Sequence, residues 1–379
     1  MDADVAVVGS GSMGSMALWQ LARRGVSTVG FEQFGAGHDR GAAGGETRIF
    51  RTAYLEGSEY VPLLQAAYRG WRELERETGR NLLTLTGGLT IGDPDAPFMH
   101  EVLESIEAFG LEHEFLDAKT AQARYPQHRL LSEEAMILDK QAGFLRPELA
   151  VLTAIQRAEE LGAAVHRNAR VESVEPFEGG VRIRAGGEDF EVGKVIVSAG
   201  PWAGALMAGW ARRLSVRRLV MTWFAAIDPA AFSPERFPVF VRRSRGVHFF
   251  GIPTVDGCTV KVALVAGYGE VEDPDSLDLA VSLNDLREIN GVVRDLMPDL
   301  APEPLRVSAY MDAYTHDGHP IVGLVEGVPN TVLLCGFSGH GFKMAPAMGE
   351  IAADLILEGG TRQQIEHLSP DRVRQIDTT

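Results

Sequence analysis

The sequence predicts an α/β fold in which a parallel sheet of βα units is interrupted by a mainly antiparallel sheet. Three observations lead to this prediction. A βαβ pattern opens the chain, short runs with strand character separated by Gly, Pro and Asp fill residues 216–266, and a strand–turn–helix pattern returns near residue 335. The first and last segments both show a strand followed by a helix. We therefore expect the parallel domain to be discontinuous, with the antiparallel sheet inserted in it.

The opening βαβ unit follows from periodicity and one glycine. Residues 4–8 form a short apolar run, typical of a buried parallel strand, and residues 27–32 form a second run of this kind. Between them, residues 13–24 carry apolar side chains at helical spacing. Gly25 then ends the predicted helix, since glycine adopts the left-handed conformation without steric cost.

The remaining elements divide the chain into two predicted domains. A basic, glycine-broken loop over 35–51 is followed by a predicted amphipathic helix over 60–78 and a hairpin strand over 84–92. We predict a helix at 147–162, three strands within 164–199, antiparallel strands at 219–227, 238–241, 247–252 and 259–265, a strand at 331–335 and a helix at 345–357. The expected division is a discontinuous nucleotide-binding domain of residues 1–85, 145–215 and 305–379, and a substrate domain of residues 86–144 and 216–304.

Composition excludes several classes of partner and site. A net charge of −16 over 379 residues argues against binding to nucleic acid or to an anionic membrane surface. The two cysteines, Cys258 and Cys335, cannot form a disulfide framework and favour a reducing compartment. The N-terminal residues lack a basic segment followed by a long apolar stretch, so we expect a cytoplasmic protein without a membrane span. No metal site is predicted.

A glycine fingerprint between the first strand and helix predicts a dinucleotide site. Gly9, Gly11 and Gly14 match G-x-G-x-x-G, in which the glycines permit a tight turn, close approach of a pyrophosphate, and close helix–strand packing. The helix N-terminus supplies free N–H groups for the phosphates. Glu32 ends the second strand, where its carboxylate would accept hydrogen bonds from ribose hydroxyls. The alternative is a plain glycine turn with an exposed Glu, and the fingerprint alone does not separate FAD from NAD.

A second glycine-rich segment favours FAD. Residues 336–343, Gly-Phe-Ser-Gly-His-Gly-Phe-Lys, lie between the last predicted strand and helix. Three glycines here indicate close approach of backbone to a ligand, and the following helix can direct its positive end at an anionic flavin ring. A plain strand-to-helix turn is the alternative, but such a turn does not need three glycines.

Together with the loop Gly45-Glu46-Thr47-Arg48-Ile49-Phe50-Arg51 and the downstream Ala53-Tyr54, these motifs resemble the monomeric sarcosine oxidase and N-methyltryptophan oxidase family along nearly the whole chain. The resemblance implies a Rossmann-type FAD-binding domain, glutathione-reductase-like, with the flavin lying against the substrate domain. It implies a monomeric oxidase that takes a small secondary (N-methyl) amino acid such as sarcosine and molecular oxygen. The products would be an imine, which water hydrolyses, and hydrogen peroxide.

The resemblance also assigns roles to individual residues. Arg51 and Lys343 match the pair that holds the substrate carboxylate, for which an arginine fork is well suited. Arg48 and Tyr54 match groups close to the flavin, and Lys261 matches a lysine that activates oxygen. By pattern alone Lys261 would face water, because lysine on an alternating strand usually does; the resemblance reverses that interpretation.

The cofactor-binding residues expected from the motifs and the resemblance are Gly9, Gly11, Ser12, Met13, Gly14, Glu32, Arg40, Thr47, Arg48, Val171, Ala199, Gly200, Trp202, Gly336, Ser338, Gly339, His340, Gly341, Phe342 and Lys343.

The chain departs from the family pattern around the amine. The flavin-linking cysteine falls at Tyr310, a family tyrosine at Asp312, a histidine at Val265 and an active-site tyrosine at Phe250. A thioether cannot form at Tyr310, and Cys335, at the end of a buried strand, is expected to be a packed core thiol. We therefore predict noncovalent FAD and an altered amine pocket.

Three other functions stay open at this point. One is an FAD-dependent dehydrogenase that passes electrons to an acceptor other than oxygen, one is an NAD-dependent dehydrogenase, and one is a flavin-binding subunit of a larger complex. The sequence does not distinguish which amine is used, or whether the α-carbon or the N-methyl carbon is oxidised.

Overall fold

The computed structural model describes residues 1–54, 56–207 and 209–374. Its first sheet has a parallel centre, in which β12 (Glu188–Val197) pairs with β1 (Ala3–Val8) and β19 (Thr331–Cys335), and β1 pairs with β2 (Thr28–Glu32). Helices α1 (Ser12–Arg23), α5 (Pro147–Glu160) and α8 (Ala345–Glu358) pack together beside this sheet, with α1 between the other two. The predicted βαβ opening and the closing strand–turn–helix are confirmed.

The prediction of three strands within residues 164–199 is wrong, because there are four. β9 (Ala164–Arg167) extends the parallel order beyond β2, whereas β10 (Val171–Phe177), β11 (Gly180–Ala185) and the first half of β12 form an antiparallel meander. A turn at Asn168, which adopts a positive φ of 55°, separates β9 from β10. Asparagine tolerates this conformation, so the turn at Asn168 gives the segment one strand more than predicted.

The second sheet is mainly antiparallel, as predicted. Its order is β17-β13-β16-β15-β14-β5-β7-β6, and only the β5–β14 pair is parallel. Its strands are β5 (Gly88–Gly92), β6 (His113–Leu116), β7 (Ala135–Asp139), β13 (Ser215–Ala226), β14 (Val239–Ser244), β15 (Val247–Ile252), β16 (Thr259–Leu264) and β17 (Leu300–Tyr314).

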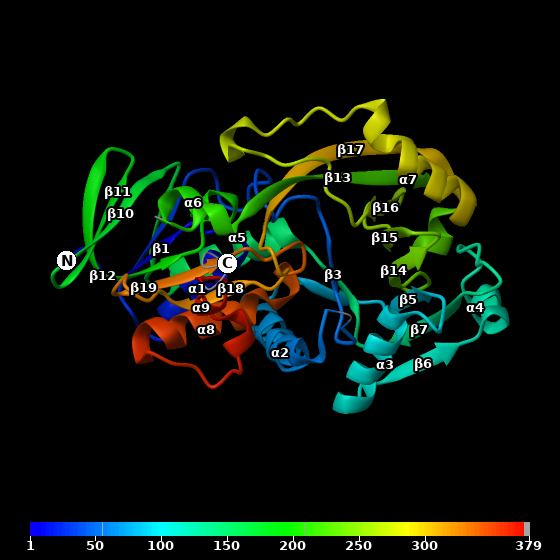
Figure 1. Cartoon of the computed structure of the whole chain (residues 1–379), viewed down its shortest axis with the longest axis horizontal. Helices are drawn as coiled ribbons and strands as arrows, with labels where there is room; N and C mark the ends of the chain where they lie inside the picture. Colours follow the sequence, from blue (N-terminus) through cyan, green and yellow to red (C-terminus); the bar gives the residue numbers. More distant parts are fainter. Residues whose placement is uncertain (55, 208, 375–379) are drawn as a thin grey trace.

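Figure 1 places the two sheets at opposite ends of the long axis, with β13 and β17 along one side. A small sheet of β3 (Arg48–Phe50), β8 (Gly143–Leu145) and β4 (Leu83–Leu85) contributes Arg48 to the region between them. The other elements are β18 (Ile321–Leu324), α2 (Val61–Thr78), α3 (Pro97–Phe109), α4 (Ala118–Arg124), α6 (Ala203–Leu206), α7 (Leu283–Leu296) and α9 (Asp371–Arg374).

The arrangement supports the domain division at 1–85, 145–215 and 305–379 against 86–144 and 216–304, which we retain as a proposal. Each sheet has its own apolar core: one surrounds α1, α2 and α8, and another fills the space between the second sheet and α7. Within the described ranges, none of the helices has the length and apolar character needed to cross a membrane.

Candidate active site

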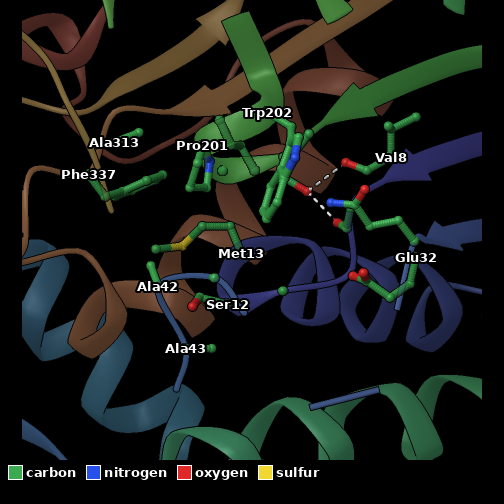
Figure 2. A pocket seen from close by; sticks show the side chains of 18 of the residues that line it. Val8, Ser12, Met13, Glu32, Ala42, Ala43, Pro201, Trp202, Ala313 and Phe337 are labelled. Carbon is green, nitrogen blue, oxygen red and sulfur yellow. Dashed lines mark hydrogen bonds between the residues drawn. The ribbon is translucent and has the colours of Figure 1, made fainter. Parts of the chain in front are cut away.

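A cavity of about 430 Å³ lies at the carboxyl ends of the parallel strands, where α1 begins. Figure 2 shows Ser12 and Met13 on one side of it and Pro201 and Trp202 on the other. Many of the predicted cofactor residues line it, namely Gly9, Gly11, Ser12, Met13, Glu32, Arg48, Val171, Ala199, Gly200, Trp202, Gly336, Gly339, Gly341 and Phe342.

The three glycines of the fingerprint differ in the space around them. Gly9 has a φ of 82°, and a Cβ on Gly14 would lie only 1.8 Å from the Gly9 carbonyl oxygen, so Gly14 allows α1 to start directly against the turn. By contrast, a Cβ on Gly11 would meet no atom within 4 Å. Gly11 lines the cavity beside the N-terminus of α1, where the motif predicts a pyrophosphate.

Glu32 lines the same cavity, but its carboxylate already accepts several hydrogen bonds. The N–H of Ser10 lies 3.1 Å from Oε2 and the N–H of Phe34 lies 3.0 Å from Oε1. His38 Nε2 is 3.3 Å from Oε1. Burial raises the pKa of Glu32, but His38 and these backbone groups outweigh it and leave the pKa below the usual value. The carboxylate is thus ionised and fixed in place for a ribose, which would compete with His38 for it.

Arg40 is a predicted cofactor residue that does not line this cavity, and Gly14 and Thr47 do not line it either. The guanidinium of Arg40 stacks on the Phe34 ring, 4.8 Å from the centroid, and the residue is exposed.

A second cavity, of about 690 Å³, adjoins the first and faces the antiparallel sheet. Five residues line both cavities, and they mark where the two meet: Ala42, Arg48, Asp312, Gly339 and Phe342. A dinucleotide in the first cavity would therefore present its reactive ring to the second. Ser338, His340 and Lys343, predicted as cofactor residues, line the second cavity only.

Arg51 and Lys343 come together in the second cavity. Arg51 Nη2 lies 2.7 Å and 2.9 Å from the two carboxylate oxygens of Glu56, and its Nη1 is buried without a hydrogen-bond partner among the described residues. Lys343 Nζ lies 3.3 Å from the Tyr54 hydroxyl. Both cations are buried, at 8% and 7% exposure. Burial and the charge of Arg51 lower the pKa of Lys343 to about 7.

Tyr54 links Lys343 to His340 through its hydroxyl. The Tyr54 oxygen lies 2.9 Å from His340 Nδ1, and His340 Nε2 lies 3.0 Å from the Gly318 carbonyl oxygen. Because that carbonyl only accepts, Nε2 carries the proton and Nδ1 accepts from Tyr54. Burial is the main reason that the pKa of His340 falls to about 4, and burial also raises the pKa of Tyr54.

Lys261 lies behind the loop that carries Arg48. Its Nζ donates to the carbonyl oxygens of Gly45 and Thr47, at 2.9 Å and 3.0 Å. Arg48 donates to Thr47 at 2.8 Å, to Ala42 at 2.8 Å and to Gly44. Lys261 is 2% exposed and does not itself line either cavity. Burial, together with the charge of Arg48, lowers the pKa of Lys261 well below its usual value. The hydroxyl of Thr47 is buried without a partner among the described residues.

The four positions that depart from the family pattern all line the second cavity: Phe250, Val265, Tyr310 and Asp312. Asp312 Oδ1 accepts from the N–H of Ala313 at 2.8 Å, and Oδ2 accepts from that of Gly339 at 2.9 Å. Burial nevertheless raises the pKa of Asp312 to about 6. Cys335 lies in the apolar core around β1 and β19 and lines neither cavity, and Cys258 is exposed.

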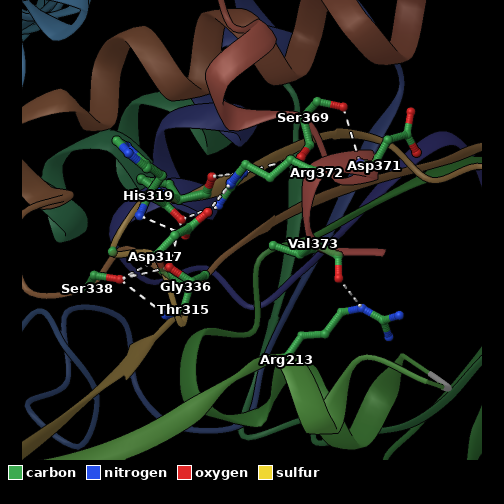
Figure 3. Close-up of polar contacts among 12 residues, drawn as sticks. Arg213, Thr315, Asp317, His319, Gly336, Ser338, Ser369, Asp371, Arg372 and Val373 are labelled. Atoms are coloured by element: carbon green, nitrogen blue, oxygen red, sulfur yellow. Dashed lines mark hydrogen bonds and ion pairs between the residues drawn. The ribbon is translucent and has the colours of Figure 1, made fainter. Parts of the chain in front are cut away.

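The glycine-rich turn and the neighbouring loop are held by polar contacts shown in Figure 3. Ser338 Oγ accepts from the N–H of Thr315 at 3.2 Å and donates to the Gly336 carbonyl oxygen at 3.1 Å. Arg372, from α9, lies 2.6 Å from Asp317. These contacts fix one wall of the second cavity.

Sequence reasoning missed several polar residues of the second cavity, among them Glu56, Arg243 and His248. Glu56 follows Arg51 in a segment without a regular pattern. Arg243 and His248 face each other across β14 and β15, a pairing that a hairpin register would have indicated. None of the described residues form a group of three or more metal-binding side chains.

The chain matches the family described as FAD dependent oxidoreductase over residues 4–355. The chain belongs to this family. It is an oxidoreductase, and FAD is its cofactor, as predicted. The glycine cradle and the space beside Gly11 fit that cofactor.

Two relatives confirm the predicted resemblance. The chain is 36% identical over 377 residues to the monomeric sarcosine oxidase of Streptomyces avermitilis, covering 98% of this chain and 97% of the relative. It is 31% identical over 365 residues to the N-methyl-L-tryptophan oxidase of Salmonella dublin, covering 94% and 95%. The solved structure of NikD, described as an unusual amino acid oxidase essential for nikkomycin biosynthesis, matches with a TM-score of 0.85 at 22% identity, covering 97% of both chains. That match confirms the fold.

Proposed function

We propose that this protein is an FAD-dependent oxidase of a small secondary (N-methyl) amino acid. The observation that carries the proposal is the pair of buried cations, Arg51 and Lys343, in a cavity that opens onto the cofactor cavity at Arg48 and Phe342. Buried cations of this kind suit a substrate carboxylate, because a charge-assisted pair strengthens where water is excluded. The relatives named as oxidases of sarcosine and N-methyltryptophan support the same class of substrate.

The residues of the site bind and orient the substrate. Arg51 and Lys343 would hold the carboxylate, which places the amine and its neighbouring carbons toward the shared wall of the two cavities. Tyr54 and His340 hold Lys343 in place through a hydrogen-bonded chain. Bound FAD would accept two electrons from the carbon beside the neutral amine and return them to oxygen as hydrogen peroxide.

Lys261 is the proposed residue for the oxygen step. Its Nζ lies with Arg48 beside Gly45, and Arg48 lines both cavities. Positive charge there favours the reduction of oxygen to an anion. Noncovalent attachment of FAD belongs to the same proposal, because a tyrosine replaces the linking cysteine. We further propose that the protein is a monomer in the cytoplasm.

The test is anaerobic bleaching of the flavin in the purified protein. We expect sarcosine, another N-methyl amino acid, proline or pipecolate to reduce the flavin faster than the matching primary or D-amino acids. Peroxide formed on readmission of air separates an oxidase from a dehydrogenase that uses another acceptor. Failure of every secondary amino acid to bleach the flavin would refute the proposal.

A further inference from the structure

The second cavity holds three buried nitrogen atoms that have no hydrogen-bond partner among the described residues. They are Nη1 of Arg51, Nε of Arg243 and Nε2 of His248, and all three side chains line the cavity. Unpaired buried polar nitrogen is uncommon in native proteins, because its desolvation costs about 1–3 kcal/mol. Arg51 is accounted for by the proposed α-carboxylate site, whereas Arg243 and His248 are not.

Arg243 and His248 form a pair on adjacent strands. They are direct partners in the antiparallel ladder of β14 and β15, so their side chains lie on the same face of the sheet. The guanidinium of Arg243 stacks on Phe98 of α3, 5.0 Å from the ring centroid, which restrains it at the cavity wall. Burial, followed by the charges of Arg243 and Arg51, lowers the pKa of His248 to about 4. At neutral pH the imidazole is therefore uncharged and free to present an N–H at Nε2.

The positive charge of Arg243 is not balanced inside the cavity. The three carboxylates that line the cavity are otherwise engaged: Glu56 pairs with Arg51, Asp317 pairs with Arg372, and Asp312 accepts two backbone N–H groups. Across the described ranges, no carboxylate forms a salt bridge with Arg243. A half-buried cation whose Nε is buried and unpaired, and which has no counter-ion, indicates an anionic ligand, the more so in a chain of net charge −16.

The size and lining of the cavity allow a longer substrate than sarcosine. Its volume of about 690 Å³ is far larger than sarcosine needs. Apolar side chains also line it, including Leu219, Met221, Val241 and Phe250, and they suit a short methylene spacer.

We propose that Arg243 and His248 form a second anion subsite, and that the preferred substrate is an N-methyl amino acid carrying a second carboxylate on its side chain. The α-carboxylate would bind at Arg51 and Lys343, which rests on the proposed function. The side-chain carboxylate would accept hydrogen bonds from Arg243 and His248. Each charge-assisted hydrogen bond of this kind is stronger than a neutral one, so the second carboxylate should dominate selectivity.

The holoenzyme should distinguish acidic from neutral substrates of the same shape. We expect N-methylglutamate or N-methylaspartate to give a kcat/KM at least about tenfold above that of N-methylnorvaline, in line with one charge-assisted contact. Arg243→Met should reduce the acidic-to-neutral ratio by about tenfold or more, and Arg243→Lys should restore part of it. Arg245→Met is the matched control, because Arg245 is exposed on the same hairpin and lies outside the cavity lining. An acidic-to-neutral ratio near one, unchanged by Arg243→Met, would overturn the proposal while leaving the oxidase function intact.

A binding experiment tests the subsite even if no N-methyl amino acid is oxidised. Glutarate and butyrate share one carboxylate and differ in the second, and the flavin spectrum reports their binding. We expect glutarate to bind more tightly than butyrate to the parent protein, and Arg243→Met to remove the difference. Equal binding of the two acids, with normal FAD content and circular dichroism, would refute the subsite independently of the reaction.

Discussion

The guanidinium of Arg51 is paired with the carboxylate of Glu56, with Nη2 of the arginine 2.7 Å from the nearer oxygen. Burial raises the pKa of Glu56, but the charges of Arg51 and Lys343 outweigh it and leave the pKa below its usual value. The carboxylate of Glu56 is thus ionised at neutral pH. It binds the Arg51 guanidinium, which is the group proposed to bind the substrate carboxylate. A substrate carboxylate must therefore compete with Glu56 for Arg51.

Substitutions at this pair should act in opposite directions. Arg51→Ala should weaken binding of a simple carboxylate by about tenfold to a hundredfold, because a charge-assisted hydrogen bond is lost. Glu56→Gln should tighten it by about fivefold, because a competing charge is removed. Titration of the flavin spectrum with propionate measures both. Two variants that bind propionate as the parent does would remove Arg51 from the site.

Carboxylate binding should weaken as the pH rises through about 7, the pKa of Lys343. Below this pH the lysine is protonated and attracts the anion, and above it the neutral amine does not. Arg51, Glu56, Tyr54 and His340 surround the lysine, and the pKa of His340 is about 4, so His340 stays neutral across this range. The dissociation constant of propionate, measured from pH 6 to pH 9, should rise with pH in the parent. In Lys343→Met the same profile should be flat near pH 7, and an unchanged profile would contradict the assignment.

Lys261→Met should separate the two half-reactions. Reoxidation of the reduced flavin should slow by on the order of a hundredfold, because a cation beside the developing anion is lost. Flavin reduction should slow far less. Stopped-flow measurements of each half-reaction check this, and equal slowing of both would exclude Lys261 from the oxygen step.

Gly14→Ala and Gly11→Ala should impair the protein in different ways, the first by lowering its stability and the second by weakening FAD binding. A Cβ at Gly14 would clash with the Gly9 carbonyl oxygen at 1.8 Å, so this variant should lose stability. A Cβ at Gly11 meets no protein atom within 4 Å, so that variant should fold normally but bind FAD weakly. Thermal unfolding and FAD content measure the two effects. A Gly11→Ala variant with full FAD content would place the pyrophosphate elsewhere.

FAD should be released by acid precipitation and remain in the supernatant. Tyr310 offers no thiol, and burial raises the pKa of Cys335 to about 12, which keeps this thiol protonated and unreactive. Cys335→Ser should therefore leave flavin release unchanged. Flavin retained in the pellet would contradict the prediction, and peptide mapping would then identify the linked residue.

The fold around the first, parallel sheet could be predicted because the sequence signals that indicate it are local. Glycine positions, apolar runs and helical periodicity around α1 and β19 each depend on a few neighbouring residues. The fold around the second, mainly antiparallel sheet was harder to predict. β17 contains Pro302 and Pro304, which argue against a strand, yet the structure tolerates them because β17 lies at the edge of its sheet.

Only some residues of the site could be predicted from the sequence. Lys261 would face water by alternation, but every residue of β16 is buried, since both faces of this inner strand are covered. Only the resemblance pointed to an internal lysine. Glu56, Arg243 and His248 carry no motif. Arg243 and His248 come from one hairpin and Glu56 from a distant loop, and they meet only across the second cavity.

The long pairing of β13 with β17 has a consequence for how the protein moves during turnover. The ladder runs from Ser215 and Tyr314 near the glycine-rich turn to Ala226 and Leu300 at the far end of the second sheet. Relative bending of the two sheet regions must bend both paired strands together, so the ladder resists a hinge motion. We therefore expect substrate entry to depend mainly on loops and side chains, which move faster than whole domains. Turnover should then depend only weakly on solvent viscosity, unlike that of enzymes limited by domain opening.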